Sequence, residues 1–88
     1  MDIQKADVVL SKVGRDKGRL FFVFDIVDKN YALIADGKIR RVDKPKKKKL
    51  KHLSFSTNKD TAIRQKILNG EKICDVQLRK ILNQFDIQ

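Results

Sequence analysis

A short internal segment, residues 38–52, carries most of the positive charge of this chain. It contains nine Lys or Arg residues and one acid, a net charge of +8, whereas the rest of the chain contributes +2. Neighbouring side chains of like charge repel one another and cannot be buried in a core without a large cost in free energy. The core must therefore be built from the segments on either side, and the run Lys46–Lys49 is predicted to be an exposed loop or arm.

Apolar and β-branched residues predict short β-strands on both sides of this basic segment. The strongest signal is residues 20–27, where the even-numbered positions from Leu20 to Ile26 are all apolar. We place this even-numbered set in the core and expect Phe21 and Val23 to be covered by another part of the protein. The predicted strands are residues 7–12, 20–27, 31–35, 38–42 and 50–55.

The dipeptide Asp36–Gly37 is typical of a two-residue type I′ hairpin turn. It predicts that Lys38–Val42 returns antiparallel to residues 31–35, with Ile39 opposite Ile34. Together with the other segments, this strand completes a set of five short strands joined by tight turns. Such a set predicts a small SH3-like barrel.

After residue 56 the spacing of apolar residues changes to a helical period. A helix is predicted over residues 59–69, where Thr57 and Asp60 resemble a capping box. A second helix follows, with Asp75 as its expected cap. Its single apolar face is formed by Leu78, Ile81, Leu82 and Phe85.

These patterns predict one domain of mainly β structure with α, because 88 residues leave room for a single core. The expected parts are a barrel over residues 1–56, with a basic loop at 43–52, and a C-terminal helical hairpin over residues 57–88 as an appendage. The longest apolar run, Leu20–Phe24, is too short to cross a bilayer. Acidic residues near the N-terminus do not fit a signal peptide, and a single Cys needs no oxidising compartment. We expect a cytoplasmic protein with no membrane partner.

Few side chains in this chain could support catalysis. With one His and one Cys, no zinc site can be built from these ligands, and no Ser, His and acid have a recognisable catalytic arrangement. Cys74 precedes the second predicted helix, where a thiol could be reactive, but a small buried hydrophobe is the favoured interpretation. We expect no enzymatic activity and no cofactor.

The basic segment and the cations near it are the candidate functional residues. A solvated charge run is the alternative interpretation, but this run is internal and flanked by predicted strands that would hold it against the domain. A basic face of this kind attracts polyanions, and Tyr31 could stack on an unpaired base. His52 could contact a phosphate or a base, or be an ordinary strand residue. The predicted RNA-binding residues are Arg15, Lys17, Arg19, Tyr31, Lys38, Arg40, Arg41, Lys44, Lys46, Lys47, Lys48, Lys49, Lys51 and His52.

Gly18, followed by alternating apolar residues after a short loop, resembles a KOW motif. The wider sequence resembles small bacterial KOW proteins that are similar to archaeal and eukaryotic-type large-subunit ribosomal proteins. This resemblance covers about residues 6–53 and includes the helical tail only loosely. It implies an SH3-like barrel and a ribosomal RNA partner. The segments that carry it are Gly14–Gly18, Val27–Tyr31, Leu33–Gly37, Lys44–Lys49 and Lys51–Leu53.

Two alternatives stay open from the sequence. The chain could be a protein-interaction module of the translation or transcription machinery, which docks a partner through the barrel or the second helix. It could also bind DNA, because phosphate contacts alone do not distinguish the two polymers. We expect the free protein to be a monomer, with RNA, and through it the large ribosomal subunit, as its partner.

Overall fold

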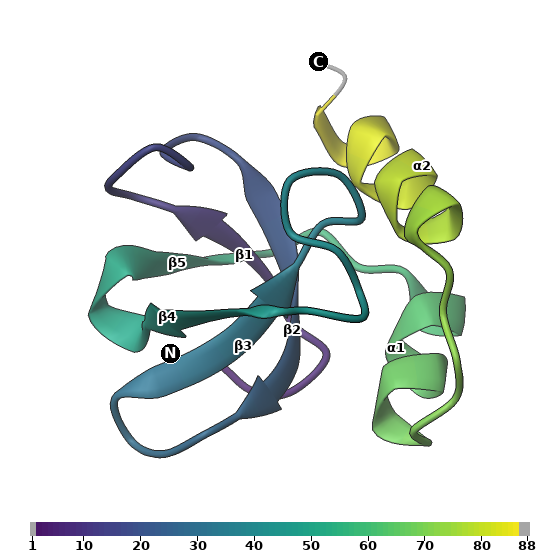
Figure 1. The fold of residues 1–88 in the computed structure, drawn as a ribbon, viewed down its shortest axis with the longest axis horizontal. Helices are drawn as coiled ribbons and strands as arrows, with labels where there is room; N and C mark the ends of the chain where they lie inside the picture. The colour runs from purple at the N-terminus through teal and green to yellow at the C-terminus, as the bar shows by residue number, and fades with distance from the viewer. Residues whose placement is uncertain (1, 87–88) are drawn as a thin grey trace.

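An antiparallel sheet forms the centre of the protein, and two helices follow it (Figure 1). A computed structural model describes residues 2–86, so the outermost residues of the predicted barrel and hairpin units, residues 1, 87 and 88, lie outside the described part. The prediction of a mainly β fold with two C-terminal helices is confirmed. The elements are β1 (Val8–Ser11), β2 (Leu20–Ile26), β3 (Tyr31–Ala35), β4 (Lys46–Lys49), the 3₁₀ turn η1 (Leu50–His52), β5 (Leu53–Ser56), α1 (Thr61–Leu68) and α2 (Asp75–Asp86).

The five strands have the order β4-β3-β2-β1-β5, so β4 and β5 form the two edges of the sheet. The predicted SH3-like barrel is not closed, because within residues 2–86 no backbone ladder joins these edges. The turn η1 connects them instead (Figure 1). This turn is held to the sheet from two sides, since Leu50 N–H donates to Asn30 O (2.8 Å) and Lys12 N–H donates to His52 O (2.9 Å).

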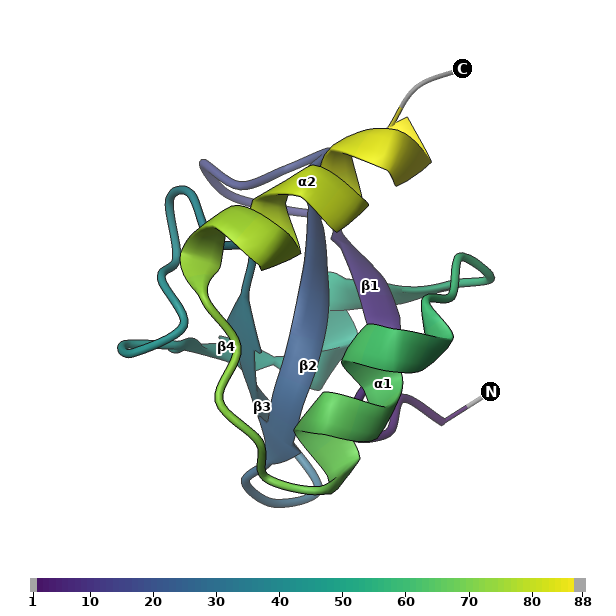
Figure 2. The same ribbon diagram turned by 90° about the vertical axis from the view of Figure 1, so that its right-hand side faces the viewer.

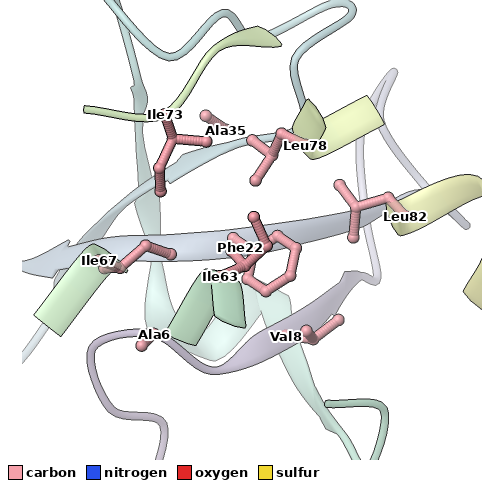
Figure 3. Close-up of a cluster of buried hydrophobic side chains, with 9 residues drawn as sticks. All are labelled: Ala6, Val8, Phe22, Ala35, Ile63, Ile67, Ile73, Leu78 and Leu82. Carbon is pink, nitrogen blue, oxygen red and sulfur yellow. The ribbon is translucent and has the colours of Figure 1, made fainter. Parts of the chain in front are cut away.

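Both faces of β2 are buried, which explains its nearly continuous apolar sequence. On one face Phe21 and Val23 pack in a cluster with Val9, Ala32, Ile34 and Leu53. On the other face Phe22 packs in a second cluster that the two helices complete (Figures 2 and 3). The register of β2 against β3 shifts between Val23 and Asp25. Because of this shift, Ile26 packs with the Phe21 cluster. It lies on the opposite face of the sheet from Leu20, Phe22 and Phe24, with which it was predicted to share one face.

The helices cover the outer face of the sheet over β1 and β2 (Figure 2). Ile63 and Ile67 of α1, and Leu78 and Leu82 of α2, are buried in the cluster around Phe22. Ile81 and Phe85 pack against the same cluster, so the predicted apolar face of α2 is confirmed. No helix in the described part of the chain is long and apolar enough to cross a membrane.

The predicted returning strand Lys38–Val42 is wrong, and the lysine run takes its place as β4. Lys46 lies opposite Ile34, where Ile39 was expected. The reason is that carboxylates take the backbone donors of the expected strand. Asp36 Oδ1 accepts from the N–H groups of Lys38 and Arg40 (both 2.9 Å), and Asp75 Oδ1 accepts from Val42 N–H (2.8 Å).

The expected type I′ turn at Asp36–Gly37 is also wrong. A type I′ turn needs positive φ at both central residues, and within residues 2–86 Ala6 is the only non-glycine residue with positive φ. Gly37 has a φ of 78° for a different reason. It packs against the first turn of α2, where a Cβ atom would collide with the backbone carbonyl of Asp75.

The helix N-termini differ in detail from the predicted caps. Asp60 itself caps α1, because its Oδ1 accepts from Ile63 N–H (2.9 Å), so the capping box with Thr57 is wrong. Asp75 lies inside α2, and its carboxylate binds Val42 N–H and Arg41 instead of capping the helix. Cys74 is exposed, contrary to the expected buried position, and its carbonyl accepts from Leu78 N–H (3.2 Å).

Candidate nucleic-acid interface

Two buried carboxylates hold three of the predicted RNA-binding cations. Asp16 is 2% exposed and lies 3.3 Å from Arg40 Nη2 and 3.9 Å from Lys48 Nζ. Asp36 is 5% exposed and its Oδ2 lies 3.7 Å from Arg19 Nη2. A buried carboxylate is tolerated only with such partners. These three cations therefore stabilise the loops around them, and the two carboxylates offset two of their three positive charges.

The alternation of β4 divides the lysine run between two environments. Lys46 and Lys48 lie opposite Ile34 and Ala32, whose side chains belong to the cluster inside the sheet. The Lys48 side chain is only 12% exposed, and its Nζ also reaches Val13 O at 3.5 Å. The other three lysines of the strand, at positions 46, 47 and 49, are exposed. The expectation of a uniformly exposed loop is wrong, because the run forms a strand and the Lys48 side chain is largely enclosed beside Asp16.

Lys47 and Lys49 flank Tyr31 on the outer side of this edge. Lys49 lies directly opposite Tyr31 in the ladder, and Lys47 Nζ lies 4.7 Å from the centre of the tyrosine ring. A cation at this distance is attracted by the ring and orients it. The arrangement presents an aromatic side chain of β3 beside the Lys47 ammonium group and next to the open edge strand β4.

A surface pocket of about 290 Å³ lies beside this tyrosine. Its lining contains three lysines and no carboxylate: Lys29, Asn30, Tyr31, Lys49, Leu50 and Lys51. Asp28 shapes one wall without lining the pocket, because its Oδ1 accepts from the N–H groups of Asn30 (2.7 Å) and Tyr31 (2.9 Å). The contact of Leu50 N–H with Asn30 O joins this wall to η1. We call this pocket the Tyr31 pocket.

His52 lies in η1 beside the Tyr31 pocket and is partly exposed. Partial burial, and then the positive charges of Lys49, Lys51 and other nearby lysines, lower the pKa of His52 below its ordinary value of 6.5. The imidazole is therefore neutral at pH 7, and it can accept as well as donate a hydrogen bond.

The other predicted cations lie outside this pocket. Arg41 pairs with Asp75 at 3.3 Å but keeps a side chain that is 69% exposed. No carboxylate of residues 2–85 lies within 4.0 Å of the remaining side chains. These exposed residues are Arg15, Lys17, Lys38, Lys44, Lys46, Lys47, Lys49 and Lys51.

Sequence reasoning missed two cations, Lys29 and Arg79. Lys29 lines the Tyr31 pocket, and its place in the turn directly before Tyr31 was a usable signal. Arg79 lies on α2 and donates from Nη1 to Gly37 O at 3.2 Å. Nothing in the sequence indicates that this helix meets the Asp36 loop, so Arg79 could be found only from the structure.

The sequence matches no model of a known protein family and no curated protein. The functional inference therefore depends on the residues themselves and on the arrangement of the basic groups. That arrangement has three parts: the Tyr31 pocket with the outer lysines of β4, the paired cations around Asp16 and Asp36, and the exposed cations of the loops.

Proposed function

We propose that this protein binds RNA through the outer side of β4 and the Tyr31 pocket. The observation that carries the proposal is an aromatic ring next to the open edge strand β4, in a pocket with three lysines and no carboxylate. Lysine ammonium groups are point charges that contact phosphate, and tyrosine stacks on unpaired bases. A site that offers both chemistries fits a single-stranded segment or loop of RNA.

Ribosomal RNA is the proposed ligand class. It is supported by the resemblance of residues 6–53 to KOW proteins of the large ribosomal subunit, and by the concentration of charge in one segment. The binding role belongs mainly to Lys29, Lys47, Lys49 and Lys51 around Tyr31, because Lys48 and Arg40 already have a carboxylate partner. Arg15, Lys17 and Lys44 would add long-range attraction from the loops.

The test compares two triple variants with the same change in net charge. Lys47, Lys49 and Lys51 are replaced by Ala in one, and the exposed helix or loop residues Lys59, Lys72 and Lys80 in the other. Binding to a ribosomal RNA fragment is measured by fluorescence anisotropy over a range of salt concentrations. Each lost phosphate contact should reduce the slope of log K against log salt by about 0.7. The first variant should lose up to three contacts, and the second should keep the slope of the original protein.

Equal losses in both variants would show that net charge alone drives binding, and the proposal would be wrong.

A second measurement tests binding to the whole ribosome. The protein should sediment with ribosomes at low salt and be released at high salt, because screening weakens exposed phosphate contacts. Tyr31→Leu should weaken binding by about 1–3 kcal/mol if one base stacks on the ring.

The alternative of a protein-interaction module is weakened by one observation. The apolar face of α2, which was a candidate docking surface, packs on the sheet of the same molecule through Leu78 and Leu82. It is therefore occupied in the folded chain. The open edge of β4 does not favour a partner strand either, since exposed lysines on an edge oppose strand addition.

A further inference from the structure

A second basic pocket lies where α2 meets the sheet, away from the Tyr31 pocket. It has a volume of about 330 Å³ and lies between the start of β2, the loop after β3 and α2. Its polar lining comes from Arg19, Asp36, Lys38, Arg79 and Asn83, with Leu20 and Leu82 as the apolar part. Three cations thus meet one carboxylate, and that carboxylate is already engaged.

The contacts of Asp36 leave the pocket with an excess of positive charge. Its Oδ1 accepts from two backbone N–H groups, and its Oδ2 pairs with Arg19 at 3.7 Å. Lys38 and Arg79 have no carboxylate within 4.0 Å among the side chains of residues 2–85. With Arg19 paired to Asp36, the net charge that faces the pocket is +2 from the other two cations.

One cation of this pocket, Arg79, is held in place by the backbone of the loop after β3. Arg79 Nη1 donates to Gly37 O at 3.2 Å, which joins α2 to the loop that presents Lys38. The remaining donors of the Arg79 guanidinium have no partner in the described residues. A planar fork of donors that is already oriented suits a phosphate group, and the Asn83 amide can add a neutral donor.

We propose that this pocket binds a backbone phosphate of the RNA, so that α2 is part of the binding surface. The inference rests on the proposed function, and it extends the site to a second contact point. Tyr31 begins β3 and Asp36 follows its last residue, a separation of about 17 Å along the strand. One nucleotide cannot occupy both pockets at this distance. The ligand is then an RNA of several nucleotides that is recognised at both ends of β3.

The first experiment probes the pocket without RNA. Inorganic phosphate is titrated into ¹⁵N-labelled full-length protein at constant ionic strength, with chloride as the matched anion. We expect saturable shifts of the amide signals of Gly18, Lys38 and Asn83 with phosphate only. The shifts should be lost in Lys38→Gln and in Arg79→Gln. Absence of saturation, or equal shifts with chloride, would overturn the proposal.

The second experiment asks whether RNA uses the pocket. A dinucleotide that can reach only the Tyr31 pocket is compared with a ribosomal RNA fragment. Lys38→Gln and Arg79→Gln should reduce the salt slope for the fragment by about 0.7 and leave the affinity for the dinucleotide unchanged. Lys80→Gln, one residue further along α2 and outside the pocket, is the control. Unchanged binding of the fragment by both pocket variants would refute the proposal.

The two proposals fail in different ways. If the protein does not bind RNA at all, every RNA measurement is negative in the unmodified protein, and phosphate titration alone reports on the pocket. If the protein binds RNA but this second pocket does not contact phosphate, Lys49→Ala and Lys51→Ala still weaken binding of the ribosomal RNA fragment. Lys38→Gln keeps the test valid if Arg79→Gln unfolds the protein, because no hydrogen bond or ion pair involves the Lys38 side chain in the described residues.

Discussion

The carboxylate of Asp16 lies between Arg40 and Lys48, in a loop that precedes β2, and is almost fully buried. It connects its own loop to Arg40 and Lys48, which follow much later in the sequence, and it offsets one of the two positive charges that would otherwise face each other. At the scale of single residues, such pairs decide which basic side chains are free. Burial and pairing make Lys48 structural, whereas its neighbours Lys47 and Lys49 remain available to a ligand.

Replacement of Asp16 by Asn should destabilise the protein by about 1–3 kcal/mol, because Arg40 and Lys48 then lose their charged partner. The value is below that of a fully buried pair, since the Arg40 side chain is 30% exposed and partly solvated. Urea unfolding at pH 7 measures the change. Asp43→Asn is the control, because Asp43 is exposed and has no ion pair with the side chains of residues 2–85. Equal stability of the two variants would contradict the structural role of Asp16.

Because the pKa of His52 is lowered, we expect RNA binding to depend on pH. The pKa of His52 is lowered in the free protein, by partial burial and then by nearby lysines, so a bound polyanion should raise it. A group whose pKa is higher in the complex takes up a proton on binding. RNA affinity should therefore increase as the pH falls through the interval between the free and bound pKa values. The contribution of His52 to the free energy of unfolding should change in the opposite direction. It should decrease as the pH falls, because the unfolded chain, with the higher pKa of His52, is protonated more readily.

The measurement is an NMR titration of the imidazole signals, which are unambiguous because the chain has one His. The apparent pKa should be higher with RNA than without it. His52→Gln should remove the part of the pH dependence of affinity that falls near this pKa. A pKa that RNA leaves unchanged would place His52 outside the interface.

At the scale of elements, the loop between β3 and β4 depends on α2. Asp75 accepts from Val42 N–H, Arg79 donates to Gly37 O, and Arg41 pairs with Asp75. These contacts hold residues 36–45 against the helix before the chain returns as β4. The position of the lysine strand is thus coupled to the docking of a helix that follows it in the sequence.

Gly37→Ala tests this coupling. Gly37 has a positive φ, and a Cβ atom would meet the carbonyl of Asp75, so Ala should displace the loop from α2. Gly70→Ala is a matched control, because Gly70 also has a positive φ but a Cβ atom there would have no neighbour within 4 Å. The control should lose about 1–2 kcal/mol from the backbone conformation alone, and Gly37→Ala should lose more. Equal losses in thermal or urea unfolding would show that the contact with α2 contributes nothing.

At the scale of the whole molecule, the helices complete the core of the sheet. Five large aliphatic residues after position 56 are buried in the cluster around Phe22: Ile63, Ile67, Ile73, Leu78 and Leu82. Burial of each contributes about 1.5–3 kcal/mol, an upper estimate. Their sum is about 7–15 kcal/mol, which equals the net stability of a typical domain.

A chain that ends at residue 56 should therefore fail to fold as a stable monomer. Its sheet would expose Val8, Phe22 and Ala35, which the helices cover in the full-length protein. Circular dichroism and NMR dispersion would show an unfolded or aggregated species. Cooperative unfolding of a monomeric fragment would instead support a barrel that is independent of its C-terminal appendage.

Local sequence signals were sufficient for most elements. Residues 20–27 are apolar at almost every position, and the apolar face of α2 repeats at helical spacing, so both elements were predictable from the chain alone. The basic segment was also evident as a source of positive charge. Tyr31 lies beside Lys47, and its role in stacking on an RNA base stays a prediction.

Tertiary structure decided which segment pairs with β3 and which cations remain free. Strand formation at Lys38–Val42 had local support, but Asp36 and Asp75 take backbone donors that the ladder would need. The lysine run pairs in its place because an edge strand lets charged side chains reach solvent on one side and Asp16 on the other. The contacts of Asp36 are local, two and four residues along the chain, whereas the contact of Asp75 with Val42 joins residues that are brought together only by folding. The sequence by itself determined the local elements and the total charge, and the packing of α2 and the position of Asp16 determined where that charge is displayed.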